Sequence, residues 1–128
     1  MKTIRVVPQV SLTSVREDRR RYPRVTVAIQ AELRPRGTDV PTRVETVDLS
    51  EGGFYVQLAF TLEVGAELDI VLWLGERRVR TKGVVVTRHP HLGNGVQFAS
   101  LSSEDAAVLA SFLDMKIRST PEKRPLVQ

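Results

Sequence analysis

The sequence predicts an all-β domain that ends in a single α-helix. Six strand-like segments lie between residues 25 and 99, where apolar and polar residues alternate and turn-forming residues separate the segments at regular intervals. The first helical periodicity appears only after residue 102. Six short strands with no helix between them are typical of a meandering antiparallel barrel or of a sandwich.

The first strand has the most regular pattern of the six. Val25, Val27, Ile29, Ala31 and Leu33 occupy every second position of VTVAIQAEL, and mostly polar residues lie between them. Such alternation indicates one continuous, half-buried strand. The segment RPRGTDVP, which is rich in turn-forming residues, ends it.

Five further strands are expected after the first. Turn-forming segments separate them: DLSEGG, LEVGAE and HPHLGN make the longer connections, and Gly75-Glu76 makes a tight hairpin. The last of the five, GVQFA, is short. The strands are expected at residues 42–47, 54–59, 68–75, 78–88 and 95–99.

The C-terminal helix is indicated by its start and by its apolar face. Ser102 and Asp105 have the spacing of a capping box, in which two side chains satisfy backbone N–H groups at the start of a helix. We expect the apolar face to cover an open end of the barrel. The residues of this face are Leu109, Phe112, Leu113 and Ile117.

Length and composition predict one folded domain with two extensions. The chain has 128 residues, enough for one modest hydrophobic core. We expect a flexible arm at residues 1–18, the barrel with its helix at residues 19–118, and a flexible tail at residues 119–128. No apolar run approaches the roughly 20 residues that span a bilayer. MKTIRVVPQV lacks the apolar centre of a signal peptide, so we expect a cytoplasmic protein.

The positive charge of the chain is concentrated in one segment. The net charge is +4, and the segment DRRRYPRV alone contains Arg19, Arg20, Arg21 and Arg24. Neighbouring guanidinium groups repel each other, so an anionic ligand would stabilise the cluster. Arginine presents a planar set of donors that matches phosphate oxygens and the edge of guanine. A solvated basic segment is the simpler alternative.

A second motif lies between the second and third expected strands. Asp48, Ser50 and Gly53 form the pattern D-x-S-x-x-G. In the simplest interpretation Asp48 and Ser50 cap a turn, and Gly53 supplies a positive φ. Alternatively, the carboxylate accepts hydrogen bonds from guanine N1–H and N2–H₂, the hydroxyl contacts a phosphate, and the glycine lets the backbone approach a flat ligand.

The chain contains no cysteine, which excludes disulfides and thiolate chemistry.

Together, R-x-x-x-R just before the first strand and D-x-S-x-x-G between the second and third resemble the PilZ domain family. The resemblance extends from the arginine cluster through the C-terminal helix. It implies a six-stranded antiparallel β-barrel with that helix. It also implies a non-enzymatic receptor for cyclic di-GMP, a bacterial second messenger, with no cofactor.

The resemblance gives each motif residue an expected role. Arg20 and Arg24 match the arginines that grip guanine edges and phosphates, and Asp48 matches the carboxylate that reads the Watson–Crick edge of guanine. Ser50 matches a phosphate or ribose contact, and Gly53 matches the close-approach position. Binding is expected to order the N-terminal arm around the ligand.

The arginines beside the first motif are expected to join the ligand site. Arg19 and Arg21 flank Arg20 directly. In the family, the residue before R-x-x-x-R influences whether one messenger molecule or a stacked pair binds. Because Arg19 can stack on a purine and neutralise phosphate, we expect a stacked pair. A downstream protein, which the sequence does not identify, would read the complex.

Two other functions fit a small basic barrel. Barrels that bind single-stranded nucleic acid usually interleave aromatic residues with cations. This chain is 5% aromatic, with only Tyr22 inside the arginine run, so nucleic acid is disfavoured. Protein–protein adaptors of the same fold generally lack the motif residues. An enzyme is not expected, because DLSEGG is not a nucleophile elbow.

Two further features have simple expected roles. Trp73 lies in an alternating strand, where packing in the core or in an interface is the usual role of tryptophan, and ligand stacking is the alternative. His89 and His91 flank Pro90. We expect a solvent-facing loop there rather than a metal site.

Overall fold

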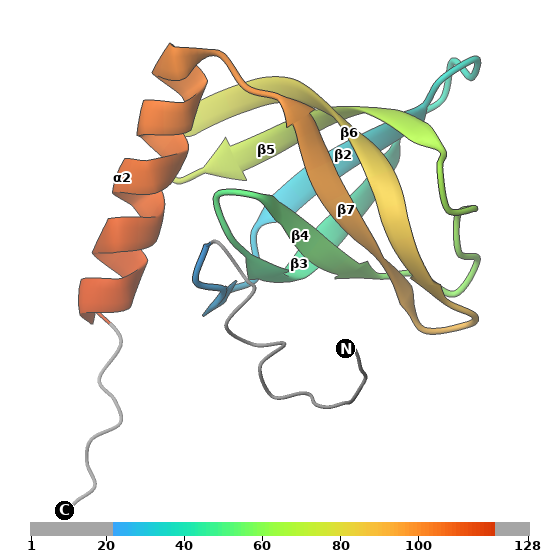
Figure 1. Cartoon of the computed structure of the whole chain (residues 1–128), viewed down its shortest axis with the longest axis horizontal. Coiled ribbons are helices and arrows are strands. Elements are labelled where there is room, and N and C mark those ends of the chain that lie inside the picture. Colours follow the sequence, from blue (N-terminus) through green and yellow to red (C-terminus); the bar gives the residue numbers. More distant parts are fainter. Residues whose placement is uncertain (1–21, 120–128) are drawn as a thin grey trace, which may run out of the picture.

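The computed structural model describes residues 22–119, which form a β-barrel with one helix across an end (Figure 1). The expected arm at residues 1–18 lies outside the described residues, as does the expected tail at residues 119–128 except for Ser119, which ends the helix; both stay predictions. The elements are β1 (Val25–Thr26), β2 (Gln30–Pro35), β3 (Thr42–Leu49), β4 (Gly53–Gln57), β5 (Glu67–Leu74), β6 (Arg77–His89), β7 (Gly93–Ser100) and α2 (Ser103–Ser119).

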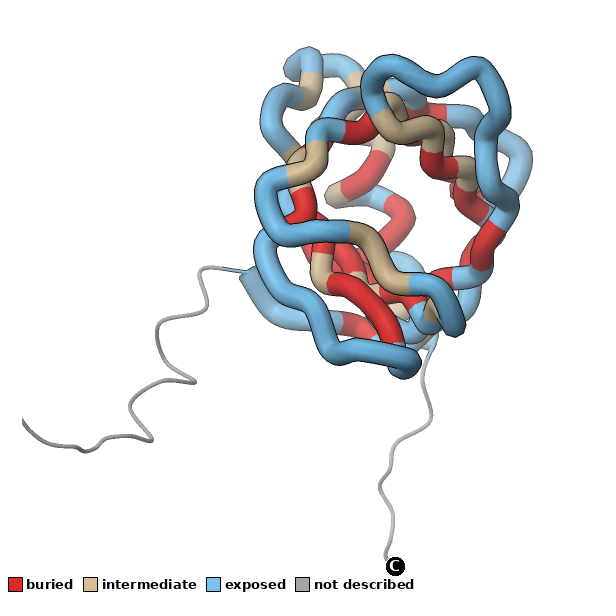
Figure 2. Tube along the Cα trace, turned by 90° about the vertical axis from the view of Figure 1, so that its right-hand side faces the viewer, coloured by how far each residue is buried: buried red, intermediate tan, exposed pale blue. Residues whose placement is uncertain are grey.

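The sheet closes on itself, which decides between a barrel and a sandwich. Strands pair in the order β3, β2, β5, β6, β7, β4, and β4 pairs with β3 again. All neighbours are antiparallel. Seen from the end opposite α2, the strands follow a closed ring (Figure 2). The expected six-stranded antiparallel barrel is therefore confirmed, with β1 and β2 acting as two parts of its first strand.

The prediction of one continuous first strand was wrong. The strand is interrupted at residues 27–29, and its register against β3 changes there, from Gln30 opposite Glu45 to Thr26 opposite Asp48. The buried Thr46 side chain bridges the interruption. Its hydroxyl accepts a hydrogen bond from the Ile29 N–H at 3.0 Å and donates one to the Val27 carbonyl at 2.7 Å. These bonds satisfy backbone groups that a regular ladder would otherwise pair.

The core fills the inside of the barrel with alternate side chains of each strand. In β5, Leu68, Ile70, Leu72 and Leu74 are buried, whereas the residues between them are partly exposed. Trp73 is among the latter, so of its two expected packing roles, core or interface, the core role is excluded. It lies on the outer face, where the Arg43 guanidinium carbon is 4.5 Å from the centre of its ring. That distance is typical of a cation–π contact.

The helix begins as the sequence predicts. The Asp105 N–H donates a 3.0 Å hydrogen bond to the Ser102 hydroxyl, which caps the first turn. Leu109, Phe112 and Leu113 are buried. Ile117 was expected on the same buried face but is 51% exposed. Beyond Leu113, α2 buries none of its described residues. The helix covers one end of the barrel with its first turns and then extends past it (Figure 1).

Candidate functional site

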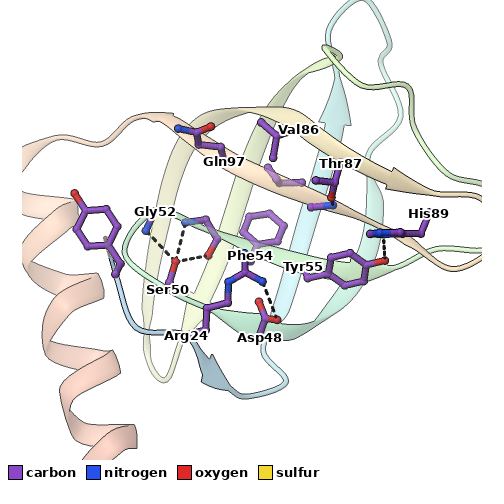
Figure 3. A pocket seen from close by; sticks show the side chains of 14 residues that line it. Arg24, Asp48, Ser50, Gly52, Phe54, Tyr55, Val86, Thr87, His89 and Gln97 are labelled. Atoms are coloured by element: carbon purple, nitrogen blue, oxygen red, sulfur yellow. Dashed lines mark hydrogen bonds and ion pairs between the residues drawn. The ribbon is translucent and has the colours of Figure 1, made fainter. Parts of the chain in front are cut away.

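A pocket of about 620 Å³ lies on the outer face of the barrel and contains the described residues of both motifs (Figure 3). Arg24 and Asp48 contribute from the start of β1 and the end of β3. The turn from Ser50 to Gly53 contributes one rim. Strands β4, β6 and β7 supply the remaining lining residues, which are Phe54, Tyr55, Val86, Thr87, His89, Gly95, Val96 and Gln97, and Tyr22 completes the set.

The pairing of β1 with β3 brings Arg24 to Asp48. Val25 lies opposite Leu49 and Thr26 opposite Asp48. The residue just before β1 therefore reaches the carboxylate, and Arg24 Nη1 is 3.7 Å from Asp48 Oδ2. The side chains are 48% and 21% exposed, respectively, so both remain accessible to a ligand. A half-exposed ion pair at this distance stabilises the fold little, typically by about 0–1 kcal/mol.

The Ser50 side chain makes its hydrogen bonds within the turn. Its hydroxyl oxygen accepts hydrogen bonds from the N–H groups of Gly52 and Gly53 at 3.1 and 3.2 Å. The Ser50 N–H donates to the Gly53 carbonyl at 2.8 Å. Ser50 is buried, at 8% exposure, although it lines the pocket. The turn-capping interpretation of this serine is correct, and its contact with a phosphate or ribose stays a prediction.

The close approach of strand β7 requires a glycine at position 53. A Cβ at this position would lie 2.0 Å from the Val96 carbonyl oxygen on β7, which no real structure allows. Its φ is not positive, in contrast to the expectation for a turn glycine. The close approach at Gly53 is therefore that of β7, and contact with a ligand stays a prediction.

The side of the pocket opposite Arg24 and Asp48 is formed by β6 and β7 (Figure 3). Gly95 lies between Tyr55 on β4 and Thr87 on β6 in the ladder. Its N–H donates to the Thr87 hydroxyl at 3.0 Å, and a Cβ at Gly95 would lie 2.4 Å from that oxygen. The glycine therefore leaves room for the Thr87 hydroxyl, which lies over the backbone on this side of the pocket.

Tyr55 and His89 close the far end of the pocket. The Tyr55 hydroxyl lies 3.0 Å from His89 Nδ1, and the ring centres are 5.8 Å apart. His89 belongs to the end of β6 rather than to a loop, so that part of the expectation was wrong. Within residues 22–119 no group of three or more histidine, aspartate or glutamate side chains is placed to hold a metal ion.

The remaining predicted site residues divide into two groups. Arg19, Arg20 and Arg21 lie outside the described residues, and their contribution to the pocket stays a prediction. Trp73, which had ligand stacking as its alternative role, is not among the described residues that line the pocket.

Sequence reasoning missed the side of the pocket formed by Tyr55, Thr87, His89 and Gln97. Each occupies an outward-facing strand position, where a polar or aromatic side chain looks like an ordinary surface residue. The one available signal was Gly95 in GNGVQF, because a glycine within a strand often marks a close approach.

Comparison with known families and structures gives consistent results. The family model described as PilZ domain matches residues 18–114. The Bacillus subtilis inhibitor of motility, MotI/DgrA, aligns with a TM-score of 0.65 and 23% identity over 83% of this chain. This chain spans 53% of the length of that structure. No curated protein sequence matches the chain.

Two isolated PilZ domains are also similar in structure. The PilZ domain of YcgR from Escherichia coli, solved with c-di-GMP, aligns with a TM-score of 0.65 and 17% identity over 78% of this chain and 92% of its own. The PilZ domain of CeSA from a cellulose-synthesizing bacterium aligns with a TM-score of 0.57 and 15% identity, over 75% of this chain and 96% of its own. At these identities the likeness concerns the fold.

Proposed function

The chain belongs to the PilZ domain family, and on that premise we propose that it is a non-enzymatic receptor for cyclic di-GMP. The observation that carries the proposal is the meeting of Arg24 and Asp48, from two separate motifs, in one accessible pocket. The PilZ domain of YcgR, which has the same fold, was solved with this ligand. A pocket that pairs a guanidinium with a carboxylate suits a ligand with both phosphates and guanine edges.

The two charged side chains would exchange partners on binding. In the free protein Arg24 and Asp48 neutralise each other across 3.7 Å. A guanine would give Asp48 two donors, N1–H and N2–H₂, and would leave Arg24 free to donate to a phosphate or to the guanine O6/N7 edge. Each loosely held charge thereby gains a better hydrogen-bonded partner.

Further parts of the proposal extend to residues 1–21. Arg19, Arg20 and Arg21 would add donors beside Arg24, and a stacked pair of ligands would supply four phosphate charges for this cluster. Ordering of the arm around the ligand would create a surface that a downstream protein reads. We place this signalling in the cytoplasm of a bacterium. Within residues 22–119, no helix is long and apolar enough to span a bilayer.

The proposal is tested by isothermal titration calorimetry with cyclic di-GMP at near-physiological salt. We expect saturable binding, with two ligands per chain if a stacked pair forms. Asp48→Asn should weaken binding about ten- to a hundredfold, because an amide cannot accept both guanine hydrogen bonds and bonds to charged groups contribute about 1.5–3 kcal/mol.

A matched control makes the test specific. Asp39→Asn changes an exposed aspartate in the β2–β3 connection, outside the pocket, and should leave the dissociation constant unchanged. Absence of binding by the folded wild-type protein would reject the receptor and favour a protein–protein adaptor. If Asp48→Asn left the affinity unchanged and the affinity fell steeply with salt concentration, the ligand would instead be a nucleic acid.

A further inference from the structure

A second hollow, of about 400 Å³, lies directly beside the candidate ligand pocket. Tyr22, Gly52 and Gln97 line both hollows, so the two share a wall. Glu51 and Phe98 are among the residues that line the second hollow alone. The backbone at this place is fixed, because the Phe98 N–H donates to the Gly52 carbonyl at 2.9 Å.

The shared wall is aromatic. The Tyr22 ring packs over Gly52, where an added Cβ would lie 3.0 Å from Tyr22 Cδ2. Tyr22 is nevertheless 39% exposed, so part of its surface stays accessible. Because Tyr22 lines both hollows, a base in either one can contact it. Proteins commonly recognise unpaired bases by stacking them on aromatic side chains.

The two hollows differ in charge. The first contains Arg24 together with Asp48. Among the described residues that line the second, none is lysine or arginine, and Glu51 is the one charged side chain. A carboxylate that has no cation beside it in the described part of the chain repels phosphate. It attracts a group that presents only donors, as the N1–H and N2–H₂ of guanine do.

The polar side chains of the second hollow are available for a ligand. Glu51 is exposed, and neither its carboxylate nor the Gln97 amide makes a hydrogen bond or ion pair with another described residue. A glutamine amide both donates and accepts, so it can complement a base edge beside the carboxylate. Reading a base by such contacts to its Watson–Crick edge is a general device of base-binding pockets.

We propose that this second hollow is a guanine subsite, in which Glu51 accepts hydrogen bonds from a guanine other than the one read by Asp48. The inference rests on the proposed function and specifies its ligand more closely. It also predicts selectivity. Adenine has an acceptor at N1 where guanine has a donor, so a carboxylate disfavours it. The guanine belongs either to the same cyclic di-GMP molecule or to a second, stacked one.

The test is calorimetric titration of the full chain and of Glu51→Gln with cyclic di-GMP. Glutamine has the same shape but only one acceptor, so it cannot accept both guanine donors. We expect the dissociation constant to rise about tenfold. Glu76→Gln, which changes an exposed glutamate in the β5–β6 hairpin, is the matched control and should bind like the wild type.

The stoichiometry distinguishes the two sources of the guanine. Loss of one of two bound ligands in Glu51→Gln would assign the subsite to the second molecule of a pair. Weaker binding at unchanged stoichiometry would assign it to the other base of the same molecule. Both results support the subsite.

A ligand analogue provides a second measurement, which compares the wild type with Glu51→Gln. Cyclic di-IMP lacks the guanine N2 amino group, so the wild type should bind it more weakly than cyclic di-GMP, and Glu51→Gln should show a smaller difference. Wild-type binding combined with an unchanged dissociation constant and stoichiometry in Glu51→Gln would overturn the subsite alone. A wild-type protein that does not bind would overturn the receptor as well.

Discussion

The motif residues that meet in the pocket are held by the fold in two very different ways. Ser50 and Gly53 are buried and fixed by backbone contacts, since the hydroxyl caps the turn and β7 leaves no space for a Cβ. Arg24 and Asp48 are partly exposed and joined only by a 3.7 Å ion pair. Ser50 and Gly53 therefore stabilise the fold, whereas the side chains of Arg24 and Asp48 remain accessible to a ligand.

The largest effect on stability is expected for Gly53→Ala. The added methyl group would meet the Val96 carbonyl oxygen at 2.0 Å, so β4 and β7 must separate. We expect the free energy of unfolding to fall by about 3 kcal/mol or more, measured by chemical denaturation.

The neighbouring glycine is the control for this effect. The methyl group of Gly52→Ala would approach the Tyr22 side chain to 3.0 Å and the Ser50 hydroxyl only to 3.8 Å, which is ordinary van der Waals contact. The substitution should cost less than about 1 kcal/mol. A Gly53→Ala variant that stays stable and loses only ligand binding would contradict a structural role for Gly53. The glycine would then be needed for the ligand and not for the fold.

An intermediate effect is expected for Ser50→Ala. The substitution removes the acceptor of the Gly52 and Gly53 N–H groups, and the second of these residues is buried. We expect a loss of about 1–2 kcal/mol in the free energy of unfolding. Ser100→Ala, at an exposed position at the end of β7, should change it by less than about 0.5 kcal/mol. Equal stabilities of the two variants would contradict a structural role for Ser50.

The smallest effect on stability is expected for Arg24→Ala. Its ion pair with Asp48 is half-exposed, so the free energy of unfolding should fall by less than about 1 kcal/mol in the same denaturation experiment. Binding of cyclic di-GMP should weaken at least tenfold in calorimetry, because a charged donor is lost. If Arg24→Ala lowered the free energy of unfolding more than Ser50→Ala does, the arginine would be a structural residue, and the distinction between the two pairs of residues would be wrong.

Most of the fold could be predicted from the sequence, because alternation and capping are local signals. The turns and the helix start at Ser102 follow from residue types alone. The interruption of the first strand could not be predicted. Burial still alternates around it, with Val25, Ile29 and Ala31 all buried, so the hydrophobic pattern gives no sign of a register change. The interruption is stabilised by hydrogen bonds to Thr46 on another strand, which only the pairing brings near.

The site was predictable only in part, for a similar reason. Asp48, Ser50 and Gly53 lie in one short segment, so their spacing is visible in the sequence. The opposite wall is assembled from β4, β6 and β7, and its members become neighbours only when the barrel closes. The ion pair of Arg24 with Asp48 likewise depends on the register of β1 against β3.

The interruption in the first strand has a consequence for local unfolding. Within the sheet, the segment from Tyr22 to Thr26 pairs with β3 alone, through the two residue pairs of β1, and Val25 adds one buried side chain. In contrast, β2 beyond the interruption is paired on both sides, with β3 and β5. Detaching β1 breaks few hydrogen bonds and leaves the closed ring intact. Its free energy of local opening is therefore expected to lie well below that of global unfolding. The barrel can hold its shape while the segment that carries Arg24 fluctuates as a separate cooperative unit.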